Sequence, residues 1–372
     1  MNFLKNILSR KDEAIKSYED FWNWFQKNEK EFYKVVKQKG NIEKDFFNKL
    51  SPKLNELKEG FYYLTGMLEE NTAELVLTPD GNIKNIVFVE ELINAAPDLP
   101  GWKFTALKPA EDIENVRIDM AGYVFDSDSL FFYSNDFRDY PDEIDITVVH
   151  RDFKEEDKTT ITNGTCIFLD SFIGELNFAT TIDNLTVIGK NDAQQELVPI
   201  EKLKNFLIWR QKEFIEKYEG VRLNTENDTH SILEAEHESG EKLVATINTE
   251  LLEWDSKASH PWIATVEMKY DGTNNNGMPD PETFQLLNDI ENEMLIELKD
   301  FDGCLNIGRQ TARGVREVYF ACRDFRKPSK VFHGSALKYG DKFDFSYDIY
   351  KDKYWQTFKR FSLSTIQKKI IS

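Results

Sequence analysis

The sequence predicts an α+β protein, because segments with helical periodicity and segments with strand periodicity follow one another along its 372 residues. Three observations support this class. Apolar residues in the first 60 positions recur at steps of three and four, as in amphipathic helices. Short alternating segments separated by turn residues follow as far as residue 255, and the segment 259–372 has a strand–helix–strand pattern twice. We therefore expect three parts: a helical hairpin (1–60), an acidic α+β domain (61–255) and a C-terminal domain (259–372).

The first 60 residues are expected to form two helices. The first carries one apolar stripe over about six turns, and Gly40 ends it. The second covers residues 42–57 but contains Pro52, so a kink or break is expected at Ser51-Pro52. We expect the two helices to cover a sheet, and a coiled-coil face is the alternative. The first stripe consists of Ile15, Tyr18, Trp22, Phe25, Phe32 and Val36.

The middle domain is expected to mix strands with helices. Residues 61–77 predict a hairpin, and residues 83–96 predict a helix. Two further helices are expected, one over 166–181 and a strong one over 200–219. The other expected strands are 102–107, 130–133, 144–149, 185–188, 232–235 and 243–247. Ser256-Lys257-Ala258-Ser259 is interpreted as the boundary to the last domain.

The charge is distributed unevenly along the chain. It contains 47 basic and 66 acidic side chains, a net charge of −19, yet from His260 onward 17 basic and 16 acidic groups nearly cancel. This balance argues against a general nucleic-acid or anionic-lipid binder, because such binding needs an excess of Lys and Arg. A cation-binding surface or a surface for a basic protein partner is expected in the acidic first two-thirds, although such an excess more commonly means a solvated acidic face.

The C-terminal domain begins with an alternating strand, 262–270, and a loop rich in Gly and Asn, 271–279. Asp280-Pro281-Glu282 then predicts a helix start, because an acidic N-cap, a proline and a carboxylate suit the first turn. The remaining expected elements are strands at 304–309, 315–321 and 343–349 and a helix at 328–339. This β-α-β-β-α-β order is the plan of ferredoxin-like folds.

This domain contains several short motifs that are separated along the chain. They are Trp262 with 267–272 and 277–279, then 307–311 with 314–320, then 350–352 with Trp355. In these residues the domain resembles the bacterial family catalogued as domain of unknown function 695. The resemblance implies a ferredoxin-like fold, and the family has no established activity. The domain is also similar in plan to the regulator of ribonuclease E activity B, which acts by binding a nuclease. Nothing comparable extends into the first 255 residues.

Three arginines gather around one expected hairpin: Arg309, Arg313 and Arg316. Two planar guanidinium groups, those of Arg309 and Arg313, can grip a phosphate or a carboxylate in bidentate fashion. Because successive residues of a strand point to opposite faces, only one of Arg316 and Glu317 can join such a site. We predict the arginines as candidates for anion or partner binding. The interpretation that we favour for them is a solvated hairpin with surface ion pairs, each contributing under about 1 kcal/mol.

The loop after the first strand of this domain provides the second candidates, Asp271, Gly272 and Gly277. Its acidic and amide residues invite comparison with a calcium loop. An EF-hand needs glycine at its sixth position, however, where this loop has Asn276. We therefore favour a glycine-rich tight bend and predict no metal site.

The sequence predicts no catalytic residues and no cofactor. It contains no nucleophile elbow, P-loop, dinucleotide-binding glycine pattern or zinc-protease helix. Its three cysteines are scattered, and its five histidines lack the spacing of metal ligands. The odd number of cysteines, with neither a signal peptide nor a long apolar segment, predicts a cytoplasmic protein.

These expectations lead to two functional hypotheses. The first is a non-enzymatic protein-binding or regulatory module with an unidentified protein partner and no nucleic-acid or membrane binding. The alternative is an enzyme of unknown reaction, in which Arg309 or Arg313 holds an anionic substrate at the junction of the last two domains. A deep pocket with converging polar groups and perturbed carboxylates would favour the enzyme.

Overall fold

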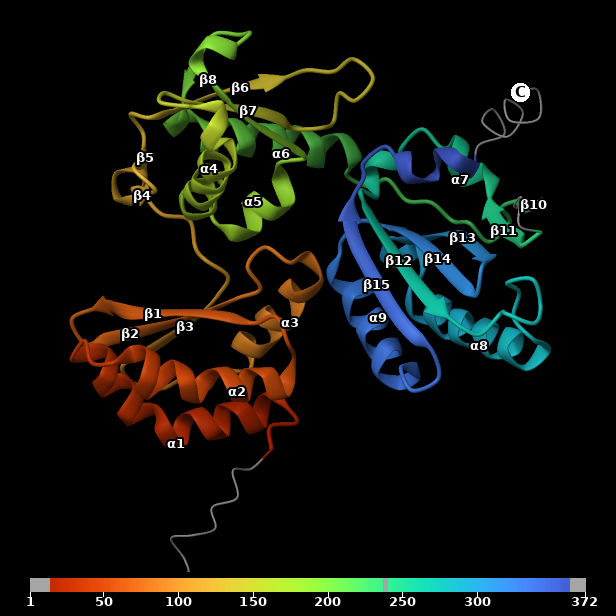
Figure 1. Ribbon diagram of the computed structural model, residues 1–372, viewed down its shortest axis with the longest axis horizontal. Helices are drawn as coiled ribbons and strands as arrows, with labels where there is room; N and C mark the ends of the chain where they lie inside the picture. Colours follow the sequence, from red (N-terminus) through yellow and green to blue (C-terminus); the bar gives the residue numbers. More distant parts are fainter. Residues whose placement is uncertain (1–13, 237–239, 362–372) are drawn as a thin grey trace, which may run out of the picture. The chain divides into compact units, whose positions relative to one another are not determined.

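The computed structural model describes residues 14–236 and 240–361, and the chain divides into two compact units. One unit contains residues up to 116 together with 169–179, and the other contains residues 117–168 and those from 180 onward. Both contain helices and strands (Figure 1), which confirms the predicted α+β class. In the described ranges no helix combines the length and the apolar character needed to cross a membrane.

The N-terminal unit contains a small sheet with helices packed along it. Its elements are α1 (Tyr18–Lys37), a π-helical turn (Glu43–Phe47), α2 (Asn48–Leu57), β1 (Tyr62–Glu69), β2 (Thr72–Thr78), α3 (Ile83–Asn94) and β3 (Trp102–Ala106). β1 and β2 form the predicted antiparallel hairpin, and β3 is parallel to β2. Figure 1 shows α1 and α2 lying along one side of this sheet, as expected.

Aromatic side chains join the helical hairpin to the sheet. The ring of Phe25 in α1 lies 5.3 Å from the ring of Trp102 and 5.3 Å from that of Phe104, both in β3. Between the two helices, Phe32 stacks on Phe46 at 4.4 Å. The helices and the sheet therefore share one core, and the boundary expected at residue 60 runs through it.

Of the kink or break expected at Ser51-Pro52, the break does not occur. Pro52 lies inside α2, and the irregular turn comes earlier, at Glu43–Phe47. Proline removes one backbone N–H, which would have reached the carbonyl four residues back. That carbonyl belongs to Asn48, directly after the π-helical stretch, and the backbone is helical without interruption from Ile42 to Leu57, so the helix continues through the lost bond.

A segment from much later in the chain completes the N-terminal unit. The helix expected over 166–181 is divided by Gly174, whose φ of +83° ends α4 (Lys158–Ile173) before α5 (Glu175–Thr181) begins. The fully buried Glu175 carboxylate accepts hydrogen bonds from the Thr78 hydroxyl (2.7 Å) and from the backbone N–H groups of Gly81 (2.7 Å) and Lys108 (3.0 Å). These bonds satisfy a buried charge, so they hold residues 169–179 firmly in this unit.

The first part of the second unit contains a small hairpin and a four-stranded sheet. The hairpin is β4 (Ile118–Met120) with β5 (Tyr123–Phe125). The sheet has the order β8-β7-β6-β9, in which β7 and β8 are parallel. Its strands are β6 (Leu130–Asn135), β7 (Asp145–His150), β8 (Asn184–Gly189) and β9 (Val198–Pro199), and α6 (Leu203–Tyr218) follows as predicted.

The C-terminal domain is a six-stranded antiparallel sheet. Its strands are β10 (His230–Glu236), β11 (Lys242–Asn248), β12 (Trp262–Lys269), β13 (Cys304–Ala312), β14 (Val315–Cys322) and β15 (Asp344–Lys351); its helices are α7 (Thr249–Glu253), α8 (Pro281–Glu297) and α9 (Arg326–Tyr339). The strand order is β10-β11-β13-β14-β12-β15. The four strands β13-β14-β12-β15 with α8 and α9 form the expected ferredoxin-like arrangement.

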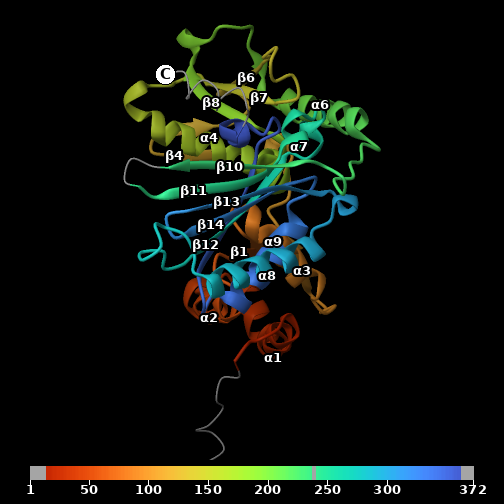
Figure 2. The same cartoon turned by 90° about the vertical axis from the view of Figure 1, so that its right-hand side faces the viewer.

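Two strands extend this sheet beyond the ferredoxin-like plan. β10 pairs with β11, and β11 pairs with the edge strand β13 along residues 243–247. Figure 2 shows these strands side by side. The boundary expected at 255–259 therefore runs through the sheet, because the pairing of β11 with β13 joins residues that lie far apart in the sequence.

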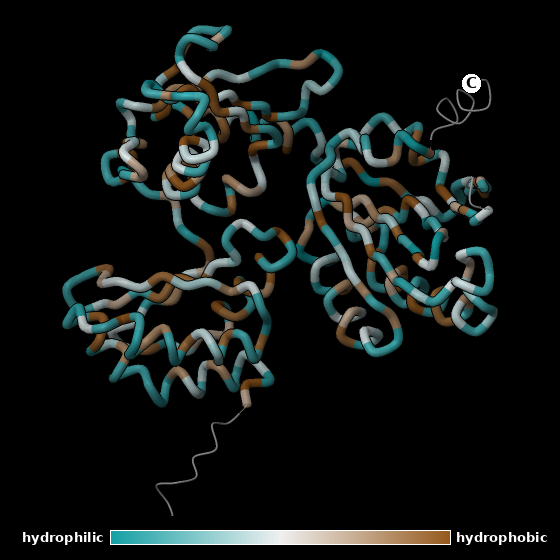
Figure 3. The backbone as a smooth tube through the Cα atoms, viewed as in Figure 1, coloured by the Kyte–Doolittle hydropathy of each residue, from teal (hydrophilic) through white to brown (hydrophobic). Residues whose placement is uncertain are grey.

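The two faces of the sheet are covered in different ways. α8 and α9 cover one face, and a short 3₁₀ segment (Gln356–Phe361) with Trp355 covers part of the other. Trp355 is 2% exposed, and its indole N–H donates to the backbone carbonyl of His260 at 2.9 Å. Apolar residues concentrate along the strands, where Figure 3 is brown. The core of this second face consists of Ala245, Ile247, Leu251, Ile263, Leu305, Ile307, Tyr319, Ala321, Trp355, Phe358 and Phe361.

We predict that the C-terminal domain needs β10 and β11 to reach its full stability. A fragment 229–372 should unfold cooperatively at a melting temperature more than about 5 °C above that of a fragment 259–372. The shorter fragment lacks Ala245, Ile247 and Leu251 from the core and leaves the edge of β13 unpaired. Circular dichroism during heating measures both. Equal melting temperatures for the two fragments would show that β10 and β11 do not stabilise the C-terminal domain.

A second prediction concerns pH. Burial lowers the pKa of His260, whose side chain is 1% exposed, to about 3. Between pH 6.5 and 3 the unfolded chain binds a proton at this residue that the folded chain does not bind. The free energy of unfolding should therefore fall by up to about 1.4 kcal/mol per pH unit as pH decreases through this window.

Urea unfolding at pH 7, 6 and 5 tests this dependence. His260→Gln should reduce the slope by up to about 1.4 kcal/mol per pH unit. The matched control is His230→Gln, because His230 is exposed, and its slope should equal that of the wild type. Identical slopes for wild type and His260→Gln would show that His260 is protonated as easily in the folded chain as in the unfolded one.

Candidate functional site

The arginine hairpin is built on a tight two-residue turn. β13 and β14 are joined by Arg313 and Gly314, which have φ angles of +52° and +72°. Two successive positive φ angles are typical of the type I′ turn that suits the twist of a hairpin. Register places Arg309 opposite Val318 and Thr311 opposite Arg316, so these four side chains point to the same face of the sheet.

Arg309 and Arg316 meet one carboxylate of helix α8. The Glu291 carboxylate lies 3.0 Å from the Arg309 guanidinium and 3.5 Å from that of Arg316. Arg316 is 1% exposed and donates further hydrogen bonds to Thr311 Oγ1 (2.8 Å) and Asn288 Oδ1 (2.9 Å). Burial lowers the pKa of Arg316, and the charge of Glu291 opposes that shift. The protein itself therefore supplies the anion between these two arginines.

Arg313 lies apart from the other two arginines. Its exposed side chain approaches Glu241, with 3.5 Å between Nε and the carboxylate oxygen. On the opposite face of the hairpin, Gln310 donates to Glu317 at 2.7 Å, which agrees with the expected alternation of the strand. Arg309 and Arg313 thus contact different carboxylates, and an anionic substrate near them stays a prediction.

The glycine loop braces this turn through its backbone. A Cβ on Gly277 would lie 2.9 Å from the backbone N of Arg313, and the carbonyl of Gly277 accepts from the Gly314 N–H at 2.9 Å. Gly272 in turn lies so close to Gly277 that its Cβ would come within 2.8 Å of the Gly277 backbone. Asp271 accepts from the Thr273 N–H at 3.0 Å, in a local turn. The loop residues therefore support the hairpin.

The last residue of β15 and the residues that follow it form a second polar cluster. The ammonium groups of Lys351 and Lys353 each lie 2.7 Å from the Asp183 carboxylate. Lys353 also donates to the backbone carbonyl of Asp142, and the Tyr354 hydroxyl donates to the Asp142 carboxylate at 2.9 Å. Burial lowers the pKa of Lys351 to about 8. This cluster fastens the end of β15 to the β6–β7 loop and to the start of β8.

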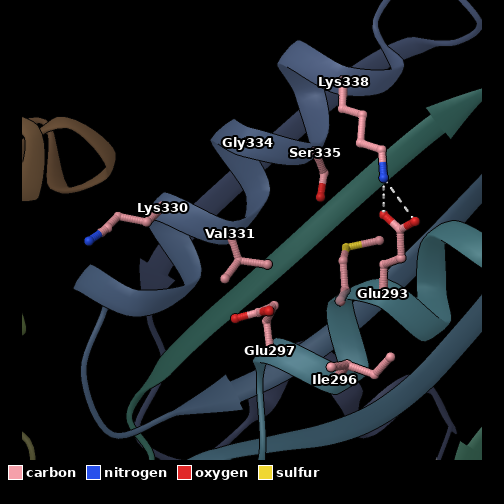
Figure 4. A pocket seen from close by; sticks show the side chains of 9 residues that line it. Glu293, Ile296, Glu297, Lys330, Val331, Gly334, Ser335 and Lys338 are labelled. Atoms are coloured by element: carbon pink, nitrogen blue, oxygen red, sulfur yellow. Dashed lines mark hydrogen bonds and ion pairs between the residues drawn. The ribbon is translucent and has the colours of Figure 1, made fainter. Parts of the chain in front are cut away.

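A groove of about 450 Å³ runs between α8 and α9 (Figure 4). Met294 is fully buried beneath it. The Glu293 carboxylate on α8 accepts hydrogen bonds from the Lys338 ammonium on α9 at 2.8 and 2.9 Å, and the pKa of Glu293 is lowered by the bonds from Lys338 and Tyr339. The groove is lined by Glu293, Met294, Ile296, Glu297, Lys330, Val331, Gly334, Ser335 and Lys338.

Gly334 leaves the middle of this groove open. Among the described residues, a Cβ at this position would have no atom within 4 Å beyond its chain neighbours and the backbone of its own helix. A glycine inside a helix costs about 1 kcal/mol relative to alanine, and no contact within the chain offsets that cost here. Large apolar side chains of the same helices are also exposed, Ile296 by 63% and Leu337 by 76%. Of these two side chains Ile296 lines the groove, so the open position at Gly334 and an exposed apolar side chain share one surface.

Sequence reasoning found the arginines but missed the residues that give them their environment. Glu291 is one of many acidic residues, and its burial follows only from the packing of α8 on the sheet. The sequence could have pointed to Lys351 and Lys353 as functional residues. Lys351 lies in the motif 350–352 and Lys353 lies between this motif and Trp355, next to an alternating strand. Gly334 also carried a signal, as a glycine in the middle of a predicted helix.

The comparisons with known proteins concern the C-terminal part. The model of a family of unknown function, DUF695, matches residues 233–363. This match confirms the resemblance noted for the C-terminal motifs, and it begins within β10 rather than after residue 255. No curated protein and no solved structure matches the chain.

We predict that Glu291 is needed to neutralise the two arginines. Glu291→Gln should lower the free energy of unfolding by about 3–5 kcal/mol, because it leaves a buried guanidinium without its counter-charge. The matched control is Glu297→Gln on the exposed side of the same helix, with a change under about 0.5 kcal/mol. Urea unfolding measures both. A loss below about 1 kcal/mol for Glu291→Gln would mean that the arginines are well solvated without the carboxylate, as at an exposed ion pair.

Proposed function

We propose that the protein is a non-enzymatic protein-binding or regulatory module, and that the α8–α9 groove of its C-terminal domain receives the partner. Gly334, a helix residue that leaves the centre of an apolar-floored groove open, carries the proposal. Removing apolar surface from water contributes about 25 cal/mol per Å². A partner that covers Ile296, which lines the groove, would therefore gain affinity from a side chain that the chain leaves exposed.

The charges around the groove favour a protein over a small anion. Carboxylates line the α8 side and ammonium groups the α9 side, so neither sign of charge prevails. Specific protein interfaces combine such a polar rim with an apolar centre. The basic partner expected from the net charge would instead contact the acidic first two-thirds, and that expectation is a separate proposal.

Variants at two open glycines test the proposal. Proteins captured from the native host by the full chain would be purified, and their affinity measured by calorimetry for wild type, Gly334→Gln and Gly66→Gln. Gly66 in β1 is the matched control, since a Cβ there also has no neighbour within 4 Å. We expect Gly334→Gln to weaken a true partner at least about tenfold and Gly66→Gln to leave it unchanged. Partners that bind all three proteins equally would contradict the groove as the binding surface.

A further inference from the structure

We infer that the partner in the α8–α9 groove is a second copy of this chain, related by a two-fold axis that runs along the groove. This inference rests on the proposed function and names the occupant of the same surface. It depends on three observations: the charges of the two helices, their opposite directions, and the position of Gly334 relative to Ile296.

The charges of the groove are sorted by helix. α8 contributes Glu293 and Glu297, whereas α9 contributes Lys330 and Lys338. Such sorting makes the surface complementary to itself, because one copy offers an acidic helix where the other offers a basic one. Closed two-fold dimers use this kind of self-complementary patch.

The order of the charges along the groove selects the axis. Glu293 pairs with Lys338 at one end, and Glu297 lies toward Val331 at the other, so the two helices run in opposite directions (Figure 4). A two-fold axis along the groove sets α8 of one copy on α9 of the other and keeps each residue at its own level. Glu293 then faces Lys338 of the other copy. An axis across the groove would set α8 on α8 and bring like charges together, which is unfavourable.

The same axis brings a large side chain over a small one. Ile296 lies three residues after Glu293, and Ser335 lies three residues before Lys338, so the two are at one level along the groove. Ile296 of each copy therefore faces Gly334 and Ser335 of the other. The missing side chain at Gly334 lets the facing helix approach closely, at the 8–10 Å that is typical of packed helices, about one helix diameter. Ile296, 63% exposed in the single chain, would be buried there.

Sedimentation of the full chain over about 1–200 µM tests the inference, because dimer formation depends on concentration. We expect a reversible dimer whose dissociation constant rises at least about tenfold in Gly334→Gln and in Ile296→Lys. Gly66→Gln should dimerise like the wild type. Urea unfolding of Gly334→Gln verifies that the variant folds, as expected because a Cβ at this position meets no atom beyond its chain neighbours and its own helix backbone.

A charge exchange separates contacts between copies from the ion pair within one copy. Lys338→Glu alone and Glu293→Lys alone should each weaken the dimer, because like charges then face each other across the axis. A mixture of the two variants should restore it, since the acidic pair of one chain faces the basic pair of the other. The pair within each chain stays broken in the mixture, so restored association reports the contact between copies.

Two results would overturn the inference. One is a chain that is monomeric at every concentration. The other is a dimer that is unaffected by Gly334→Gln or that fails to return in the mixture. Either result leaves the groove proposal to be decided separately, by whether the captured partners distinguish Gly334→Gln from Gly66→Gln. Partners that distinguish the two variants, beside a monomeric chain, would assign the groove to a different protein.

Discussion

A sheet with apolar side chains on both faces must be covered on both, and α8 and α9 cover only one face of the C-terminal sheet. The segment directly after β15 covers the other, with Trp355, Phe358 and Phe361 over Tyr319 and its neighbours. Its covering position fixes where β15 must end. There Lys351 and Lys353 reach Asp183, so one short segment both closes a core and fastens the domain to the preceding sheet.

The local parts of this architecture could be predicted from the sequence, because each depends on neighbours along the chain. The alternation of apolar and polar residues predicted the strands of the C-terminal domain. The helix start predicted at Asp280 is also present, because the Asp280 carboxylate caps α8 by accepting from the Thr283 N–H at 2.8 Å. The ferredoxin-like plan was expected from the order of the elements alone. For the candidate site, spacing correctly predicted that arginines gather on one hairpin and that Arg316 and Glu317 point to opposite faces.

The remaining features depend on residues that are distant in sequence. Pairing of β11 with β13 has no local signal, and the Ser256-Lys257-Ala258-Ser259 segment has the composition of a linker although it lies inside one domain. The counter-ion of Arg316 was unpredictable for the same reason, since Glu291 reaches it only when α8 packs on the sheet. A groove arises where two helices fail to fill the space between them, and spacing along one helix cannot reveal that gap.

The anchoring of residues 169–179 by Glu175 has a consequence for synthesis of the chain. The N-terminal unit includes those residues although its remaining residues end at 116. When the first 116 residues have emerged from the ribosome, Glu175 has not yet emerged. Its carboxylate is therefore not yet available to accept hydrogen bonds from Thr78, Gly81 and Lys108. Domains usually fold as they emerge from the ribosome. The N-terminal unit, however, cannot be completed until residues 117–168 of the other unit and then residues 169–179 have been translated. The order of assembly thus differs from the order of the sequence.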